Sequence, residues 1–131
     1  MAQKILIIDD ERVNLSLVKF TLAEKGYAVS QAVDGEEGIA KVQSESPDLI
    51  ILDVQMPRMN GYEFMGALKS LQGAQITPVI MLTANETMEG MFKLEGARAY
   101  FVKPVNMAAF LSKVKEILSA EKSGQTSANL G

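Results

Sequence analysis

Five short apolar runs divide the chain, at residues 4–8, 27–32, 49–52, 79–82 and 99–102. Most of them are rich in isoleucine, valine and leucine and show little alternation with polar residues. Strands that are buried on both faces of a parallel sheet have this pattern. The runs therefore predict five strands of one sheet that is covered on both sides.

The segments between these runs carry apolar residues three or four positions apart, which places them on one face of a helix. These faces are Val13, Leu17 and Phe20 in the first segment, Ile39 and Val42 in the second, Phe64, Leu68 and Leu71 in the third, Met88, Met91 and Phe92 in the fourth, and Phe110, Val114 and Ile117 in the fifth. Gly26 can end the first helix in the left-handed conformation. The second helix must end before Pro47, because the residue that precedes a proline disfavours helical angles. The fourth and fifth helices are expected at residues 85–95 and 106–120.

Strands and helices thus alternate five times with short connections, which favours a parallel sheet with helices on both faces and right-handed crossovers. The periodicity alone does not give the order of the strands. Residues 1–121 form one predicted domain. Residues 122–131 are polar with no apolar face, and we expect them to be a disordered tail or a truncated linker.

Composition narrows the possible functions. The net charge is −3, and no clustered basic surface is evident, so direct nucleic-acid binding is not expected. Cysteine and histidine are both absent, which excludes thiolate and imidazole ligands and the most common general base. No apolar run approaches the roughly 20 residues of a membrane helix, and no signal peptide is evident. We therefore expect a cytoplasmic location without membrane insertion.

Polar side chains follow four of the predicted strands. Asp9 and Asp10 follow the first strand, Asp53 the third, Thr83 the fourth and Lys103 the fifth. In an open parallel sheet, ligands bind outside the carboxyl ends of the strands, so these side chains should meet at one edge. Each also has a simpler interpretation: an aspartate can cap a helix, and a strand can end in a threonine or in Lys-Pro without any chemical role.

Asp53 is the hardest of these residues to explain by structure alone. It directly follows an apolar run, so its carboxylate should be only partly solvated, which is costly without compensation. Three carboxylates close together repel one another unless a cation is present. Magnesium fits this edge because it prefers oxygen ligands, binds through one or two carboxylates and keeps several waters. The pattern therefore predicts a Mg²⁺ site.

Four motifs at these strand ends resemble a known family. They are Ile-Ile-Asp9-Asp10-Glu11, Leu-Asp53-Val-Gln-Met-Pro57-Arg-Met-Asn-Gly61, Leu-Thr83-Ala84 and Tyr100-Phe-Val-Lys103-Pro104. Over residues 4–120 the chain resembles the receiver domain of two-component response regulators, including single-domain chemotaxis regulators. The resemblance implies a flavodoxin-like, doubly wound α/β fold, with a five-stranded parallel sheet in the order 2-1-3-4-5 and five helices.

The resemblance also implies a role for each site residue. Asp53 would be the phosphoacceptor and a Mg²⁺ ligand, Asp10 a direct ligand, Asp9 a ligand through water, and Gln55 a ligand through its backbone carbonyl. Lys103 would pair with the phosphoryl group and Thr83 would hydrogen-bond to it. Thr83 and Tyr100 would form the conformational switch, while the side chains of Gln55 and Asn85 would tune the phosphoryl lifetime. Pro104 would follow a cis peptide bond.

The implied partners are a sensor histidine kinase or a histidine phosphotransfer protein as the phosphodonor, and a downstream protein at the face formed by the fourth helix, fifth strand and fifth helix. A homodimer is possible, and the chain could be a fragment of a larger response regulator or hybrid kinase. It would catalyse only its own phosphorylation and dephosphorylation.

Three other functions are open. A flavin-binding electron carrier would need a phosphate-binding loop where Asp9 and Asp10 stand. A haloacid-dehalogenase-like phosphatase has a second aspartate two residues after its nucleophile, where this chain has Gln55. A degenerate receiver that only binds a partner would not need the full set of site residues.

Overall fold

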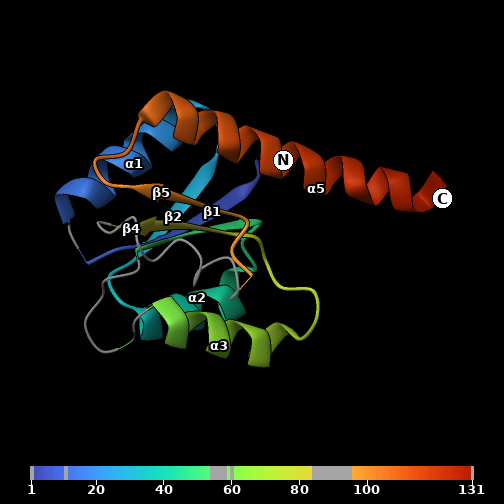
Figure 1. Cartoon of the computed structure of the whole chain (residues 1–131), viewed down its shortest axis with the longest axis horizontal. Helices are drawn as coiled ribbons and strands as arrows, with labels where there is room; N and C mark the ends of the chain where they lie inside the picture. The colour runs from blue at the N-terminus through green and yellow to red at the C-terminus, as the bar shows by residue number, and fades with distance from the viewer. Residues whose placement is uncertain (1, 11, 54–58, 60, 84–95, 131) are drawn as a thin grey trace.

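The computed structural model describes residues 2–10, 12–53, 59, 61–83 and 96–130, with the side chains at 12–15 and 120–130 outside that description. Five strands form one parallel sheet in the order β2-β1-β3-β4-β5 (Figure 1). The strands are β1 (Lys4–Ile8), β2 (Ala28–Ala32), β3 (Leu49–Asp53), β4 (Val79–Thr83) and β5 (Ala99–Val102). The flavodoxin-like order 2-1-3-4-5 is confirmed, and each strand lies within one residue of its predicted bounds.

Helices cover both faces of the sheet (Figure 1). They are α1 (Arg12–Glu24), α2 (Gly35–Glu45), α3 (Gly61–Gln72) and α5 (Met107–Leu130). In Figure 1, α1 and α5 lie on one side, and α2 and α3 lie on the other. The predicted fourth helix, at residues 85–95, lies outside the described residues. No helix in the described part of the chain is long and apolar enough to cross a bilayer.

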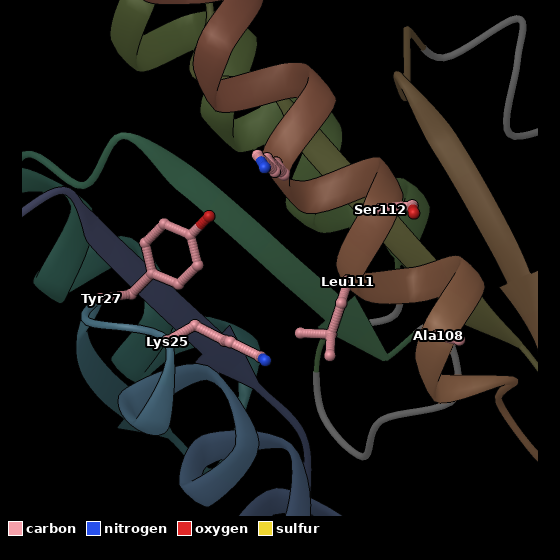
Figure 2. A pocket seen from close by; sticks show the side chains of 6 residues that line it. Lys25, Tyr27, Ala108, Leu111 and Ser112 are labelled. Carbon is pink, nitrogen blue, oxygen red and sulfur yellow. The ribbon is translucent and has the colours of Figure 1, made fainter.

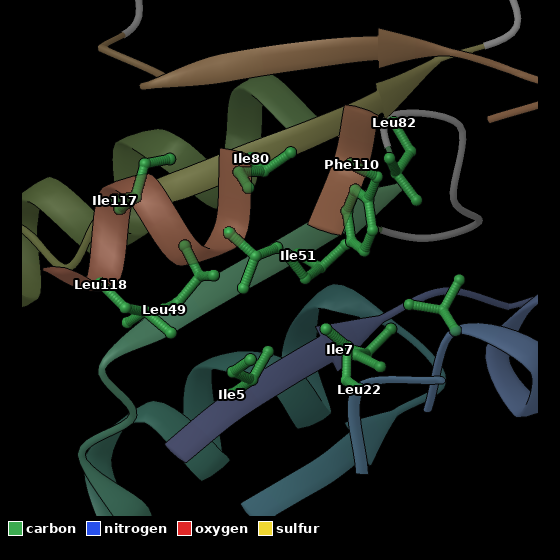
Figure 3. Close-up of a cluster of buried hydrophobic side chains, with 12 residues drawn as sticks. Ile5, Ile7, Leu22, Leu49, Ile51, Ile80, Leu82, Phe110, Ile117 and Leu118 are labelled. Atoms are coloured by element: carbon green, nitrogen blue, oxygen red, sulfur yellow. The ribbon is translucent and has the colours of Figure 1, made fainter. Parts of the chain in front are cut away.

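The central strands are buried on both sides, as the apolar runs predicted. In β1, Ile5 and Ile7 belong to a core cluster with α1 and α5, while Leu6 and Ile8 belong to a second cluster with α2 and α3. This alternation follows from the two-residue period of a strand. Figure 3 shows the first cluster, in which Phe110 of α5 packs over the sheet.

The face of α1 that meets the sheet differs from the predicted one. Leu17 and Phe20 are 59% and 64% exposed, whereas Val18 and Leu22 are buried. The side chain of Val13, the third member of the predicted face, is outside the described part. Val18 and Leu22 are also spaced for one helical face, so α1 has two candidate faces, and its packing against the sheet selects between them.

The other predicted faces are largely confirmed. Phe64 and Leu68 of α3 are buried together with Met65, while Leu71 at the end of the helix is 39% exposed. On α2, Val42 is buried and Ile39 packs against the same core cluster.

The ends of α2 agree with the sequence pattern. Asp34 caps its start by accepting a hydrogen bond from the Glu37 backbone N–H at 2.8 Å. The helix ends at Glu45, before Pro47, and Ser46 takes the left-handed conformation with φ 48°.

Helix α5 is longer than predicted. It begins at Met107, where the Asn106 side chain accepts a hydrogen bond from the Ala109 backbone N–H at 3.1 Å. Its bounds extend to Leu130, beyond the predicted end at residue 120, while the expectation that residues 122–131 are a disordered tail or a truncated linker stays a prediction. Burial of Phe110 and Val114 anchors the first part of the helix. Once a helix is nucleated, each added residue gains one hydrogen bond, so the lack of an apolar face does not by itself end it.

Candidate functional site

The carboxyl ends of β1 and β3 bring the three predicted aspartates together. Ile8 pairs with Leu52 in the parallel register, so the residues that follow them, Asp9 and Asp53, are neighbours across the sheet. One carboxylate oxygen from each of Asp9, Asp10 and Asp53 lies within 4.8 Å of the others. Asp9 and Asp53 are 2% and 3% exposed, while Asp10 is exposed.

Lys103 supplies the positive charge at this edge. Its Nζ lies 3.4 Å from Asp53 Oδ1 and 3.9 Å from Asp9 Oδ2, and its side chain is 20% exposed. The Lys103 backbone N–H donates to the Thr83 carbonyl at 2.7 Å, which holds the end of β5 beside the end of β4. The peptide bond between Lys103 and Pro104 is cis, as the family resemblance implied.

The charge balance of this group favours an additional cation. Among the described residues, Asp9, Asp10 and Asp53 bring three carboxylates to this group, and Lys103 brings one ammonium group. Buried like charges repel unless they are compensated. A group of carboxylate oxygens alone, without nitrogen or sulfur donors, suits a hard cation such as Mg²⁺. The described residues therefore fit the predicted metal site.

Thr83 and Tyr100 lie on the same face of the sheet. Thr83 ends β4 and is fully buried. Tyr100 on β5 is opposite Met81, two residues before Thr83, and packs against the core cluster that contains Met81. Because side chains on one face recur every second residue, Thr83 and Tyr100 are diagonal neighbours. The remaining predicted site residues, Gln55 and Asn85, lie outside the described residues.

A small hollow adjoins Lys103. It has a volume of about 170 Å³ and is lined by Leu17, Val18, Leu82, Lys103, Pro104, Val105 and Met107. Sequence reasoning placed Leu17 on the buried face of α1 and so missed this surface. The competing pair Val18 and Leu22 was the signal in the sequence that could have revealed it.

A comparison with protein families and curated proteins gives a consistent result. The model of the response regulator receiver domain matches residues 5–115. The chain is 40% identical over 120 residues to the alkaline phosphatase synthesis transcriptional regulatory protein PhoP of Bacillus subtilis, covering 90% of this chain and 49% of that protein. It is 40% identical over 117 residues to the transcriptional regulatory protein CpxR of Escherichia coli, covering 88% of this chain and 49% of that protein. The chain thus spans about half the length of these curated relatives.

Solved structures agree with this result. The chemotaxis response regulator CheY4 of Vibrio cholerae is 36% identical with a TM-score of 0.81, covering 89% of this chain and 99% of that chain. A CheY-like receiver domain protein from Methanospirillum hungatei is 34% identical with a TM-score of 0.86, covering 95% of this chain and 99% of that chain. Response regulator TrrA of Thermotoga maritima was solved with Mg²⁺ and BeF. It is 34% identical with a TM-score of 0.79, covering 88% of this chain and 98% of that chain. The chain therefore belongs to the response regulator receiver domain family of two-component systems.

Proposed function

We propose that this receiver domain is a phosphorylation switch in which Asp53 accepts a phosphoryl group from a phosphohistidine. The observation that carries the proposal is the position of the buried Asp53 carboxylate, 3.4 Å from the Lys103 ammonium group and within 4.8 Å of two further carboxylates. This arrangement combines a nucleophile with groups that can bind a dianion and a metal ion.

The metal in this proposal is Mg²⁺. Asp10 and Asp53 would hold it directly, Asp9 through water, and Gln55 through its backbone carbonyl. Gln55 lies outside the described residues. The similarity to TrrA, which was solved with Mg²⁺ and BeF, supports this choice. Mg²⁺ bound there would stabilise negative charge on the transferring phosphoryl oxygens.

The chemistry follows from the residues at the site. A carboxylate oxygen of Asp53 attacks phosphorus, the O–P bond forms, and the P–N bond of the phosphohistidine breaks with its electron pair remaining on the imidazole nitrogen. A carboxylate nucleophile needs no general base. Lys103 pairs with the transferred phosphoryl group, and the Thr83 hydroxyl donates a hydrogen bond to it. Such catalysis rests mainly on positioning and charge stabilisation.

The same site resets the switch. Water attacks phosphorus, the O–P bond to Asp53 breaks, and inorganic phosphate leaves while the carboxylate is restored. The side chains of Gln55 and Asn85 flank this path in the proposal and tune the lifetime. The domain thus catalyses only its own phosphorylation and dephosphorylation.

The hollow beside Lys103 offers a contact for a protein phosphodonor. Leu17 is 59% exposed at its edge, and an apolar side chain of a partner helix could bury it there. The donor would be a sensor histidine kinase or a histidine phosphotransfer protein, which inserts its phosphohistidine toward Asp53.

The output of the switch is conformational. Movement of Thr83 toward the phosphoryl group would let the Tyr100 ring turn inward, which changes the surface formed by the predicted fourth helix, β5 and α5. A downstream protein or a second copy of the chain would bind that surface. PhoP and CpxR are about twice as long as this chain, which supports a receiver that acts within a longer regulator.

Incubation with acetyl phosphate and Mg²⁺, followed by intact mass spectrometry, tests the proposal. We expect one added phosphoryl group on the wild-type chain and none on Asp53→Asn or in excess EDTA. Asp48→Asn is a matched control, because Asp48 lies outside the site and the amide can still accept the hydrogen bond from the Lys4 backbone N–H. Equal labelling of Asp53→Asn would place the phosphoacceptor elsewhere.

A further inference from the structure

A second and larger hollow lies between α5 and the turn that leads into β2 (Figure 2). Its volume is about 410 Å³, and its lining residues are Lys25, Tyr27, Ala108, Leu111, Ser112 and Lys115. The four residues on α5 are spaced at intervals that place them on one side of the helix. In Figure 2, the Lys25 side chain extends toward Leu111 across this hollow.

The walls of this hollow are held in place by the fold. The backbone N–H groups of Lys25 and Tyr27 both donate to the Leu22 carbonyl, at 3.0 and 3.4 Å. Gly26 between them has φ 94°, so Lys25 and Tyr27 lie on either side of a tight turn. Tyr27 and Leu111 both pack against the core cluster beneath α5. The floor of the hollow is therefore continuous with the core.

The charge of the hollow is opposite to that of the chain as a whole. Among the described residues, its lining contains two lysines and no carboxylate, whereas the whole chain has a net charge of −3. Within the described residues, neither the Lys25 nor the Lys115 ammonium group has an ion-pair partner. Tyr27, Leu111 and Ala108 contribute apolar surface to the same lining. The hollow thus combines an apolar surface with a positive rim.

We propose that this hollow binds a small amphipathic organic anion. The apolar body of the ligand lies against Tyr27 and Leu111, and its carboxylate, sulfonate or phosphate group pairs with Lys25 and Lys115. The volume is within the range of about 300–1,000 Å³ typical of small-molecule sites. The hollow is separate from the phosphoacceptor site, because Tyr27 precedes β2 whereas Asp9 and Asp53 lie at the carboxyl ends of strands parallel to it. It is therefore a second binding site of the domain.

An NMR titration of the full chain with 2-naphthalenesulfonate tests this site. We expect saturable amide shifts at residues 25–27 and 108–115, with a dissociation constant of about millimolar or lower. The uncharged 2-naphthalenemethanol at the same concentrations should bind at least about threefold more weakly, because it lacks the charge that the lysines attract. Lys25→Gln and Lys115→Gln should each weaken sulfonate binding by about twofold to fivefold. Lys19→Gln, an exposed lysine on α1 outside the hollow, should leave it unchanged.

Four outcomes of the titrations would overturn the proposal, and a fifth would come from their dependence on protein concentration. Two of them concern the spectra: amide shifts that centre on Lys103 instead of the hollow, and no saturable shift at all. The other two concern affinity: equal binding of the alcohol and the sulfonate, and unchanged sulfonate affinity in the Lys25→Gln/Lys115→Gln double variant. The titration is repeated at a second protein concentration. If the amides of the hollow shift with protein concentration alone, a second copy of the chain occupies it, and the ligand proposal is wrong.

Discussion

The Cδ1 methyl group of Ile8 fills the space beside Gly38 in which a side chain would otherwise begin. A β-carbon built on Gly38 would lie 2.5 Å from Ile8 Cδ1 and 3.2 Å from Phe64 Cε1. The contact with Ile8 Cδ1 is too close for a real side chain and the contact with Phe64 Cε1 is tight, so a side chain at position 38 would force Ile8 to move. Ile8 directly precedes Asp9, and this packing therefore supports the end of the strand that carries the site.

Gly38→Ala should destabilise the domain by about 1–3 kcal/mol, because the added methyl group overpacks the core against Ile8. Ile8→Val removes the Cδ1 atom and alone should cost about 0.5–1.5 kcal/mol. The double variant Gly38→Ala/Ile8→Val should be more stable than Gly38→Ala alone. Urea denaturation of all four proteins measures this coupling. Strictly additive effects would show that the two side chains are not in conflict.

Gly66 and Gly26 make a matched pair for a second prediction. A β-carbon would have no neighbour within 4 Å at either position, but Gly26 has φ 94° whereas Gly66 lies inside α3. Gly66→Ala should stabilise the domain by about 0.5–1 kcal/mol, because alanine loses less backbone entropy in a helix. Gly26→Ala should destabilise it, because a β-carbon strains the left-handed conformation. Thermal unfolding distinguishes the two, and stabilisation by both substitutions would contradict the backbone argument.

Magnesium affinity should depend more on Asp10 than on Asp9. Asp9 is buried, and its Oδ2 lies 3.9 Å from Lys103 Nζ, whereas Asp10 is exposed at the edge of the cluster. In our proposal Asp10 is a direct ligand and Asp9 acts through water, so Asp10→Ala should weaken binding about tenfold or more. Amide shifts during a Mg²⁺ titration measure the affinity. A larger loss in Asp9→Ala would reverse the assignment of the direct ligand.

Leu17→Ser should slow phosphorylation by a protein donor without affecting a small donor. Leu17 is exposed beside the hollow that contains Lys103, so the substitution removes apolar contact area but no catalytic group. We expect a decrease of about fivefold to tenfold with a histidine-phosphorylated phosphotransfer protein that labels the wild type. The rate with acetyl phosphate should be unchanged.

Leu71→Ser is the matched control for this experiment, because Leu71 is 39% exposed on α3. If both leucine variants slow the protein donor equally, the effect is not specific to the hollow. If Leu17→Ser also slows labelling by acetyl phosphate, the substitution has disturbed the site itself.

Thr83→Ala should uncouple phosphorylation from the signal. In the wild type, beryllofluoride with Mg²⁺ should shift the amides of Ala99–Val102 and of the predicted fourth helix at residues 85–95. Thr83 and Tyr100 are diagonal neighbours on one face, so loss of the hydroxyl should reduce these shifts while the variant still binds the mimic. NMR spectra of both proteins with the mimic decide the question. An unchanged response in Thr83→Ala would assign the switch to other residues.

The sequence by itself determined the strands and which charged side chains gather at the carboxyl edge of the sheet. A strand buried on both faces must be apolar along its whole length, so β1, β3 and β4 were visible as unbroken runs. Because parallel strands end at a common edge, the residue after each run had to lie there. Asp9, Asp53 and Lys103 could therefore be predicted to meet before any distance was known. The strand order came from family resemblance, since periodicity carries no information on which strands are neighbours.

Only the tertiary structure decided which face of α1 is buried. Both Leu17 and Val18 have helical partners of similar hydrophobicity, so the choice depends on how the helix is rotated against the sheet. The hollow at Lys25 and Tyr27 likewise depends on α5 lying beside a turn about 80 residues away in sequence, a separation that local patterns cannot encode. Local periodicity indicates which apolar faces a helix or strand can bury. The elements against which such a face packs depend on the fold of the whole chain.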